Sequence, residues 1–238
     1  MIHQVTEAEF YSHLLPQKTA SYRPVSNSMI NELVFEEAQS QGYKITGKGY
    51  RSNPSRTEFI AMFTLNKPEQ GLNRMIGYRN SFNKKWAVGF VAGALVMICS
   101  NGMMAGDIIT FRRHTKSIEH DLKEIIHQAF NEISPRFDGL LTDTLFLKEK
   151  LIQQNQAMQL LSDLYFNRKL LSVTQMSLLK EKLYVDPNFS LPEDPSTYFP
   201  VWNLYNQITE AMKHGNPGFY FQQHIALHDY FQSSLRSV

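Results

Sequence analysis

The chain has 238 residues, of which 42% are hydrophobic and 12% aromatic, so it can bury a substantial core and is not a disordered tail. Its one cysteine, Cys99, excludes an intramolecular disulfide, and the N-terminus lacks the basic and apolar regions of a signal peptide. The longest apolar stretch, residues 86–99, is shorter than the roughly 18–20 residues of a membrane-spanning helix. We therefore expect a soluble, cytoplasmic protein without a membrane partner.

Charge is unevenly distributed along the chain. Residues 41–117 contain twelve of the 24 Lys and Arg residues but only three of the 22 Asp and Glu residues. This segment has a net charge of +9, and the remainder of the chain has −7. A basic segment within an acidic chain indicates a polyanionic partner, most simply nucleic acid, but it specifies no reaction.

The first forty residues predict two helices. A short helix begins after Thr6 and ends before Pro16, because proline disfavours helical geometry in the residue that precedes it. Ser26 can cap a second helix over residues 27–41, in which apolar side chains recur at steps of three and four. Gly42 is a natural end for it.

Residues 43–111 change to a pattern of strands and turns. Strands are predicted over residues 43–50, 57–65, 73–80 and 108–111, with one apolar face in 57–65. The apolar run 86–100 predicts one or two strands that are buried on both faces. Asn101-Gly102 predicts a tight turn. Nine of the twelve glycines lie in residues 41–117, as expected of a tightly turned sheet.

Helical periodicity returns after Thr115. It predicts a helix over residues 118–133 that is capped by Ser117 and ended by Ser134-Pro135. Further helices are predicted over 138–170, with a break near 154–156, over 173–183 after a cap at Ser172 or Thr174, and over 202–213. Four prolines make residues 185–200 irregular, and residues 216–238 receive no assignment.

The expected fold class is α+β, with an antiparallel sheet that is preceded by a helix and followed by a helical C-terminal half. Residues 1–116 are expected to form the helix and the basic sheet module. Residues 117–238 form the helical region, which we expect to pack on the sheet as part of one domain.

The basic segment predicts a nucleic-acid interface. Its cations alternate with Tyr43, Tyr50, Tyr78, Phe82 and Trp86, and such a surface can contact phosphates and stack on unpaired bases. The alternative is a solvated sheet face whose aromatic side chains belong to the core. If the cations converge on one face and contact phosphates, replacing Lys84 and Lys85 with Ala weakens binding to all sequences alike. The candidate contacts are Lys44, Lys48, Arg51, Arg56, Arg74, Arg79, Lys84, Lys85, Arg112, Arg113 and Lys116.

Signals for catalysis or metal binding are weak. Cys99 and His114 could form a nucleophile and its base, but no catalytic signature surrounds either residue. A small buried side chain and a histidine that organises a turn near Asn101-Gly102 are the simpler interpretation. His224 and His228 would share a face if the tail is helical, but no Glu lies between them and no Cys lies nearby. We therefore expect no metal and no cofactor, and we favour a role without catalysis.

Several short motifs resemble those of a known family. The motif residues are Ser81 in Gly77-Tyr78-Arg79-Asn80-Ser81, Cys99, Asn101 and Gly102 in Val96-Met97-Ile98-Cys99-Ser100-Asn101-Gly102-Met103, and His114 and Thr115 in Arg113-His114-Thr115. Trp202 and Asn206, followed by Lys213-His214, resemble the C-terminal helix of the same family. Over residues 75–215 the chain resembles the phage/plasmid-like proteins of unknown function. The resemblance implies no activity, but it implies a setting in prophages, phages and conjugative plasmids of bacteria.

These observations together favour a nucleic-acid-binding protein of a mobile genetic element. DNA is the preferred ligand over RNA, and single-strand binding or annealing is the narrower expectation. The alternative is a protein-interaction module that inhibits a host defence factor, and a Cys/His enzyme is third. The sequence leaves a host or phage protein partner and homo-oligomer formation open.

Overall fold

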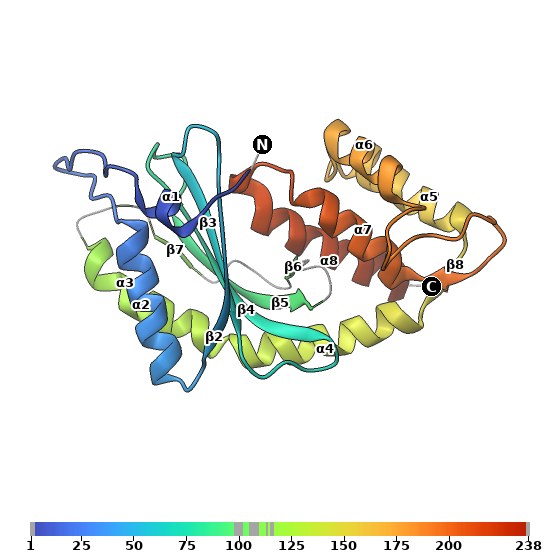
Figure 1. Ribbon diagram of the computed structural model, residues 1–238, viewed down its shortest axis with the longest axis horizontal. Coiled ribbons are helices and arrows are strands. Elements are labelled where there is room, and N and C mark those ends of the chain that lie inside the picture. The colour runs from blue at the N-terminus through green and yellow to red at the C-terminus, as the bar shows by residue number, and fades with distance from the viewer. Residues whose placement is uncertain (1–2, 98–101, 105–109, 113, 115–116, 237–238) are drawn as a thin grey trace.

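The computed structural model describes residues 3–97, 102–104, 110–112, 114 and 117–236. At its centre is an antiparallel sheet of strand order β1-β2-β3-β4-β5, and β6 and β7 both pair with the outer edge of β5 (Figure 1). This arrangement confirms the expected α+β class. The strands are β1 (His3–Gln4), β2 (Ile45–Ser52), β3 (Glu58–Leu65), β4 (Leu72–Ser81), β5 (Val88–Val96), β6 (Gly102–Met103) and β7 (Thr110–Arg112).

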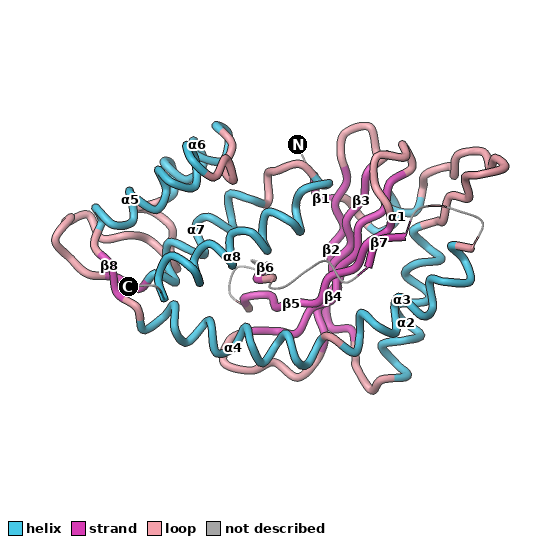
Figure 2. Tube along the Cα trace, turned by 180° about the vertical axis from the view of Figure 1, so that it is seen from behind, coloured by secondary structure: helices cyan, strands magenta, loops and turns pink. Residues whose placement is uncertain are grey.

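Helices lie on both sides of this sheet (Figure 2). The helices α1 (Glu7–Tyr11), α2 (Asn27–Ser40) and α3 (Ile118–Asn131) belong to one side. The chain then continues through α4 (Ile133–Glu149), α5 (Gln154–Ser162), a π turn (Asp163–Asn167) and α6 (Val173–Lys182). It ends with α7 (Val201–Met212), a 3-10 turn (Pro217–Phe219) and α8 (Tyr220–Arg236), while β8 (Leu151–Ile152) pairs with β9 (Phe199–Pro200) away from the main sheet.

The second helix forms as its sequence predicts. The Ser26 side chain accepts a hydrogen bond from the Met29 backbone N–H at 3.1 Å, which satisfies one of the unpaired donors of the first turn. Ile30 and Val34 are fully buried against the sheet. Gly42 follows the helix with a φ of +74°, which a residue with a Cβ adopts only with strain.

Strand β5 confirms the prediction of a strand buried on both faces, since every residue from Val88 to Val96 is buried. The helices α2 and α3 cover one face of the sheet, and α8 packs against the other (Figure 1). The residues of α4 and α7 form a larger core with one end of β4 and β5, including Leu72 and Val96. The helical half of the chain therefore packs directly on the sheet.

Helix boundaries in the second half differ from the prediction. Ser134-Pro135 does not end a helix, because α4 begins at Ile133 and Pro135 lies in its first turn, where the missing N–H is not required. Ser117 precedes α3 without a capping bond from its side chain. The break falls at residues 150–153, earlier than predicted, because β8 pairs there with β9. The unassigned tail is helix α8. Within the described part of the chain, no helix is both long and apolar enough to span a membrane.

Candidate nucleic-acid interface

The sheet has two chemically different faces, which follow from the strand register. Tyr50, Ala61, Tyr78 and Phe90 stand opposite one another across β2 to β5, on the face that α2 and α3 cover. We call this the aromatic face. The alternate positions form the other face, which we call the glycine face because it contains Gly47, Gly49, Gly77, Gly89 and Gly93.

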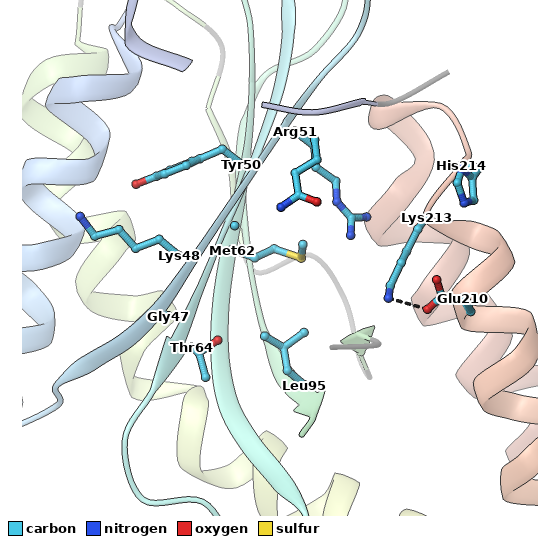
Figure 3. A pocket seen from close by; sticks show the side chains of 12 residues that line it. Gly47, Lys48, Tyr50, Arg51, Met62, Thr64, Leu95, Glu210, Lys213 and His214 are labelled. Atoms are coloured by element: carbon cyan, nitrogen blue, oxygen red, sulfur yellow. Dashed lines mark hydrogen bonds and ion pairs between the residues drawn. The ribbon is translucent and has the colours of Figure 1, made fainter. Parts of the chain in front are cut away.

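A cavity of about 520 Å³ lies between the glycine face and the C-terminal end of α7 (Figure 3). We call it the groove. The side chains that line it include Arg51, Met62 and Leu95 from the sheet and Glu210, Lys213 and His214 from the end of α7. In Figure 3, Arg51, Met62 and Leu95 point toward α7, whereas Lys48 and Tyr50 point the opposite way, toward α2.

Glycines keep the sheet side of the groove open. A Cβ at Gly49 would have no neighbour closer than 3.9 Å, so a side chain there would fill space that is now empty. Gly47 is tighter, because its Cβ would lie 3.0 Å from Oγ1 of Thr64. The opposite wall carries the ion pair of Lys213 Nζ and a Glu210 carboxylate oxygen at 2.5 Å. A ligand in the groove would therefore meet cationic side chains on both walls and bare backbone between them.

Four other predicted contact residues already have carboxylate partners. Glu7 and Glu9 of α1 supply two of these carboxylates, and the hydrogen bond from Lys48 is the main cause that holds the pKa of Glu7 below its usual value. The other two carboxylates come from within the basic segment itself. The pairs are Lys48–Glu7 at 3.0 Å, Arg56–Glu9 at 2.8 Å, Lys85–Glu58 at 3.0 Å and Arg74–Glu69 at 3.7 Å.

Arg79 is not on the surface, contrary to its prediction as a phosphate contact. Only 7% of the residue is exposed. Its Nη1 donates to the Gly218 carbonyl at 2.6 Å, and its guanidinium lies over the Trp86 ring at 5.7 Å. Burial lowers its pKa to about 10. Arg79 therefore joins β4 to the turn before α8.

The described cations do not converge on one face. Arg56, Lys84 and Lys85 lie at the hairpin end of the sheet, where Lys84 Nζ lies 4.7 Å from the centre of the Tyr22 ring. Lys44 and Arg74 lie at the opposite end. Arg51 is the described sheet cation whose side chain points into the groove. Arg113, Lys116 and the side chain of Arg112 lie outside what the structure describes.

Three of the five predicted stacking residues are core residues. Tyr50, Tyr78 and Phe82 are buried on the aromatic face, so they are not available to stack on bases and the core alternative is correct for them. Tyr78 Oη donates to Asn31 Oδ1 at 2.7 Å, and Tyr50 Oη donates to Glu7 at 3.0 Å. Burial, followed by the contacts with Tyr11 and Glu7, raises the pKa of Tyr50.

The motif residues that the structure describes have structural roles. Ser81 Oγ donates to the Trp86 carbonyl and accepts from the Trp86 N–H, both at 3.0 Å, which fixes the turn between β4 and β5. Trp202 is buried and stacks on Tyr205, and Asn206 Nδ2 donates to the Trp202 carbonyl at 2.8 Å. Cys99, Asn101 and Thr115 lie outside the described residues.

His114 is far from Gly102, which corrects the prediction that both organise one turn. Gly102 pairs with Leu95 and Arg112 pairs with Val88, and these two partners are seven residues apart on β5, which is about 23 Å at roughly 3.3 Å per residue. His114 is buried, and its Nδ1 accepts from the Val25 backbone N–H at 3.2 Å. It thus holds the segment before α2.

A polar cluster is buried behind the groove. The guanidinium of Arg51 lies 5.3 Å from the centre of the Tyr220 ring, whose centre is 4.4 Å from that of His224. Tyr220 and His224 are completely buried. Burial, with a smaller contribution from the Arg51 charge, lowers the pKa of His224 to about 3, so this imidazole is neutral near pH 7.

Residues 15–237 match the model of a family described as a domain of unknown function, DUF932. The chain belongs to the DUF932 family. Neither the curated proteins nor the solved structures contain a match. Family membership therefore supplies no activity, and the groove itself must carry the functional argument.

In this DUF932 chain, sequence reasoning missed the side of the groove that α7 and α8 supply. Lys213 and His214 entered only through the motif resemblance, and Tyr220 did not enter at all. The i, i+4 spacing of Tyr220 and His224 was the available signal, but it has meaning only if the tail is a helix. Among the described residues, no three His, Cys, Asp or Glu side chains are arranged to hold a metal ion.

Proposed function

We propose that the protein binds nucleic acid, DNA in preference to RNA, in the groove between the glycine face and the end of α7. One observation carries this proposal. The groove brings together the cations Arg51 and Lys213 from segments more than 150 residues apart, with His214 beside Lys213, and Glu210 supplies the one carboxylate among its described lining residues. Clustered cations that face an open cavity favour a ligand with phosphate groups.

The chemistry of the groove favours contact with the phosphate backbone. Tyr50 is the aromatic residue among the described lining residues, and its ring points away toward α2 (Figure 3). Base stacking therefore receives no support from this surface. A cavity of about 520 Å³ has the size of a small-ligand pocket, which suits a short length of single strand and not a duplex. Single-strand binding or annealing is thus the narrower form of the proposal.

The proposed setting is the cytoplasm of a bacterium that carries a phage or plasmid. The motifs around Ser81, Gly102 and His114 support it by their resemblance to phage/plasmid-like proteins. Single-stranded DNA is an intermediate in the replication and recombination of such elements. A binder that contacts phosphates without reading bases would suit that role.

The test compares two double variants that each remove two cations. Fluorescence anisotropy measures the affinity for labelled single- and double-stranded oligonucleotides at about 50 and 200 mM salt. Arg51→Gln with Lys213→Gln should weaken single-strand binding at least about tenfold and flatten the salt slope by about 1.4, from about 0.7 per lost contact. Lys84→Ala with Lys85→Ala, at the hairpin end, is the matched control and should have a smaller effect. An equal or larger effect of the control variant would contradict the groove as the binding site.

Removing the acid from the groove should strengthen oligonucleotide binding, whereas removing the cations should weaken it. Glu210 pairs with Lys213, and its negative charge repels phosphate. Glu210→Gln should therefore tighten oligonucleotide binding several-fold, with the largest gain at low salt. Weaker binding would show that Glu210 supports the site rather than opposing the ligand.

A specific observation favours the alternative, a protein-interaction module that inhibits a host defence factor. Among the described residues, four cations of the basic segment are paired with carboxylates, so less of its charge is available to a polyanion than the sequence suggests. Such a module would bind no oligonucleotide even at low salt. That result with the parent protein would replace the nucleic-acid proposal with this one.

A further inference from the structure

The beginning of α8 places three polar side chains together behind the groove. Tyr220 and His224 are one helical turn apart and completely buried. The guanidinium of Arg51 comes from β2 and lies over the Tyr220 ring. The cluster therefore joins an early strand to the last helix of the chain.

These side chains lack the partners that buried polar groups normally have. Arg51 Nη1, Tyr220 Oη and both ring nitrogens of His224 are buried, and none makes a hydrogen bond of normal length and angle to a described residue. Buried donors and acceptors are nearly always paired, because leaving one without a partner is costly. Three such residues in contact indicate a place where a ligand supplies the missing bonds.

The cluster lies directly behind the wall of the groove. Arg51 belongs to both, since it lines the groove and covers the Tyr220 ring. Leu95, which also lines the groove, pairs with Gly102. A Cβ at Gly102 would lie 3.1 Å from Met104 Cε, 3.6 Å from Tyr220 Oη and 3.8 Å from His224 Cε1, so the strand backbone and the flexible Met104 side chain pack directly on the cluster at this glycine.

We propose that Arg51, Tyr220 and His224 form a recess that binds one phosphate group of the strand held in the groove. This inference rests on the proposed function and assigns the residues that grip the ligand. Arg51 supplies a charged donor, Tyr220 supplies a hydroxyl donor, and neutral His224 supplies one ring N–H. Phosphate oxygens accept from all three kinds of donor, and a hydrogen bond to a charged donor is stronger than a neutral one.

The recess fits an anion better than a cation or a neutral group. Burial is the main cause that lowers the pKa of His224, and the nearby positive charges of Arg51 and Lys213 lower it further. A cation would meet the same repulsion. A phosphate would offset it, so binding should raise the pKa of His224, which is an observable in addition to affinity.

The first experiment uses inorganic phosphate with the full chain. NMR of the His224 ring, labelled with ¹⁵N and ¹³C, should show saturable shifts on addition of millimolar phosphate and a rise of its pKa by about one unit. Tyr220→Phe and Arg51→Lys should each weaken phosphate binding about five- to tenfold. Tyr205→Phe is the matched control, because Tyr205 Oη is also buried without a hydrogen bond to a described residue but lies away from the groove, and it should change nothing.

The second experiment separates this inference from the proposed function. The same variants are titrated with a single-stranded oligonucleotide. If the oligonucleotide binds equally well to the parent, Tyr220→Phe and Arg51→Lys, and phosphate leaves His224 unshifted, the recess is wrong and the function stands. If phosphate shifts His224 but no oligonucleotide binds, the recess stands and the function is wrong. If Tyr220→Phe unfolds at the same temperature as the parent protein, a loss of binding in this variant does not result from a loss of folded protein.

Discussion

The buried tyrosine hydroxyls on the two faces of the sheet differ in their hydrogen bonding. On the aromatic face, Tyr78 Oη contacts Asn31 Oδ1 at 2.7 Å and the Asn27 carbonyl at 3.3 Å. On the glycine face, Tyr220 is just as deeply buried, but its hydroxyl makes no hydrogen bond of normal length and angle to a described residue. A satisfied network stabilises and specifies a core. An unsatisfied one beside an open groove indicates a binding site.

The same contrast applies to charge. Lys48 points to the aromatic face and pairs with Glu7, whereas Arg51, three residues later, points to the glycine face and has no carboxylate partner among the described residues. These two cations are equivalent in a count of sequence charge. Their difference arises because side chains alternate along a strand, so the faces of β2 meet different neighbours. Location and pairing, and not number, decide which cation can meet a ligand.

The largest expected effect comes from closing the tightest contact on the glycine face. A Cβ at Gly218 would lie 2.1 Å from the Trp86 ring, and the Gly218 carbonyl accepts from Arg79. Gly218→Ala should therefore lower the free energy of unfolding by about 3 kcal/mol, the upper end for overpacking. Urea denaturation measures it. The control is Gly139→Ala at an exposed position of α4, where a Cβ meets nothing within 4 Å. It should raise the free energy of unfolding by up to about 1 kcal/mol. Equal stability of parent and Gly218→Ala would contradict the tight packing of this turn.

The second effect is a pH dependence that originates on the glycine face. The pKa of His224 is lowered from 6.5 to about 3 in the folded state, so between these values the unfolded chain takes up a proton that the folded chain does not. Stability should therefore fall as the pH drops below 6.5, by about 2 kcal/mol at pH 5 from this group.

Urea unfolding at pH 7 and pH 5 isolates that contribution, since the acidic side chains with lowered pKa values titrate below this window. His224→Gln should lose less stability than the parent over the same interval. His114, whose pKa burial also lowers, remains in both proteins and cancels in the comparison. Identical losses would mean that His224 is accessible to protons in the folded state.

The third effect compares one hydroxyl from each face. Tyr78→Phe leaves two buried oxygen acceptors without their donor and should cost about 1–2 kcal/mol. Tyr220→Phe removes a hydroxyl that makes no hydrogen bond of normal geometry to a described residue, and it should leave stability unchanged or slightly raise it. Thermal unfolding of the two variants measures the difference. A cost for Tyr220→Phe as large as that for Tyr78→Phe would show that the two faces are alike.

Much of the fold was predictable because local rules govern it. Ser26 caps α2 as predicted, and the unbroken apolar run of β5 indicated a strand covered on both faces. The predicted helix boundaries were wrong where one residue type is compatible with two different positions relative to a helix. Pro135 was assigned to the end of a helix, but it lies in the first turn of the next one, since proline suits both positions.

The candidate site was much less predictable, because tertiary contacts decide which polar groups are accessible. Arg79 was a candidate contact, yet a turn more than 130 residues later in the chain covers it. Tyr50 was a candidate stacking residue, but α2 covers its side chain in the folded chain. The groove needs α7 and α8 beside β2, and no pattern within either segment specifies that they meet. Charge segregation marked Arg51 as a candidate, but it marked ten other residues equally.

The smallest expected effect concerns the ion pairs of the aromatic face. Lys48 and Glu7 pair at 3.0 Å, but their side chains are 39% and 45% exposed, so water screens the attraction. A double-mutant cycle with Lys48→Ala and Glu7→Ala should give a coupling of at most about 0.5 kcal/mol, lower still at about 1 M salt. In oligonucleotide binding, Lys48→Ala should have little effect, since Lys48 points away from the groove while Arg51 points into it (Figure 3). If Lys48→Ala weakened binding as much as Arg51→Gln, the strand would cross the aromatic edge of β2, and the division of the sheet into a structural and a functional face would fail.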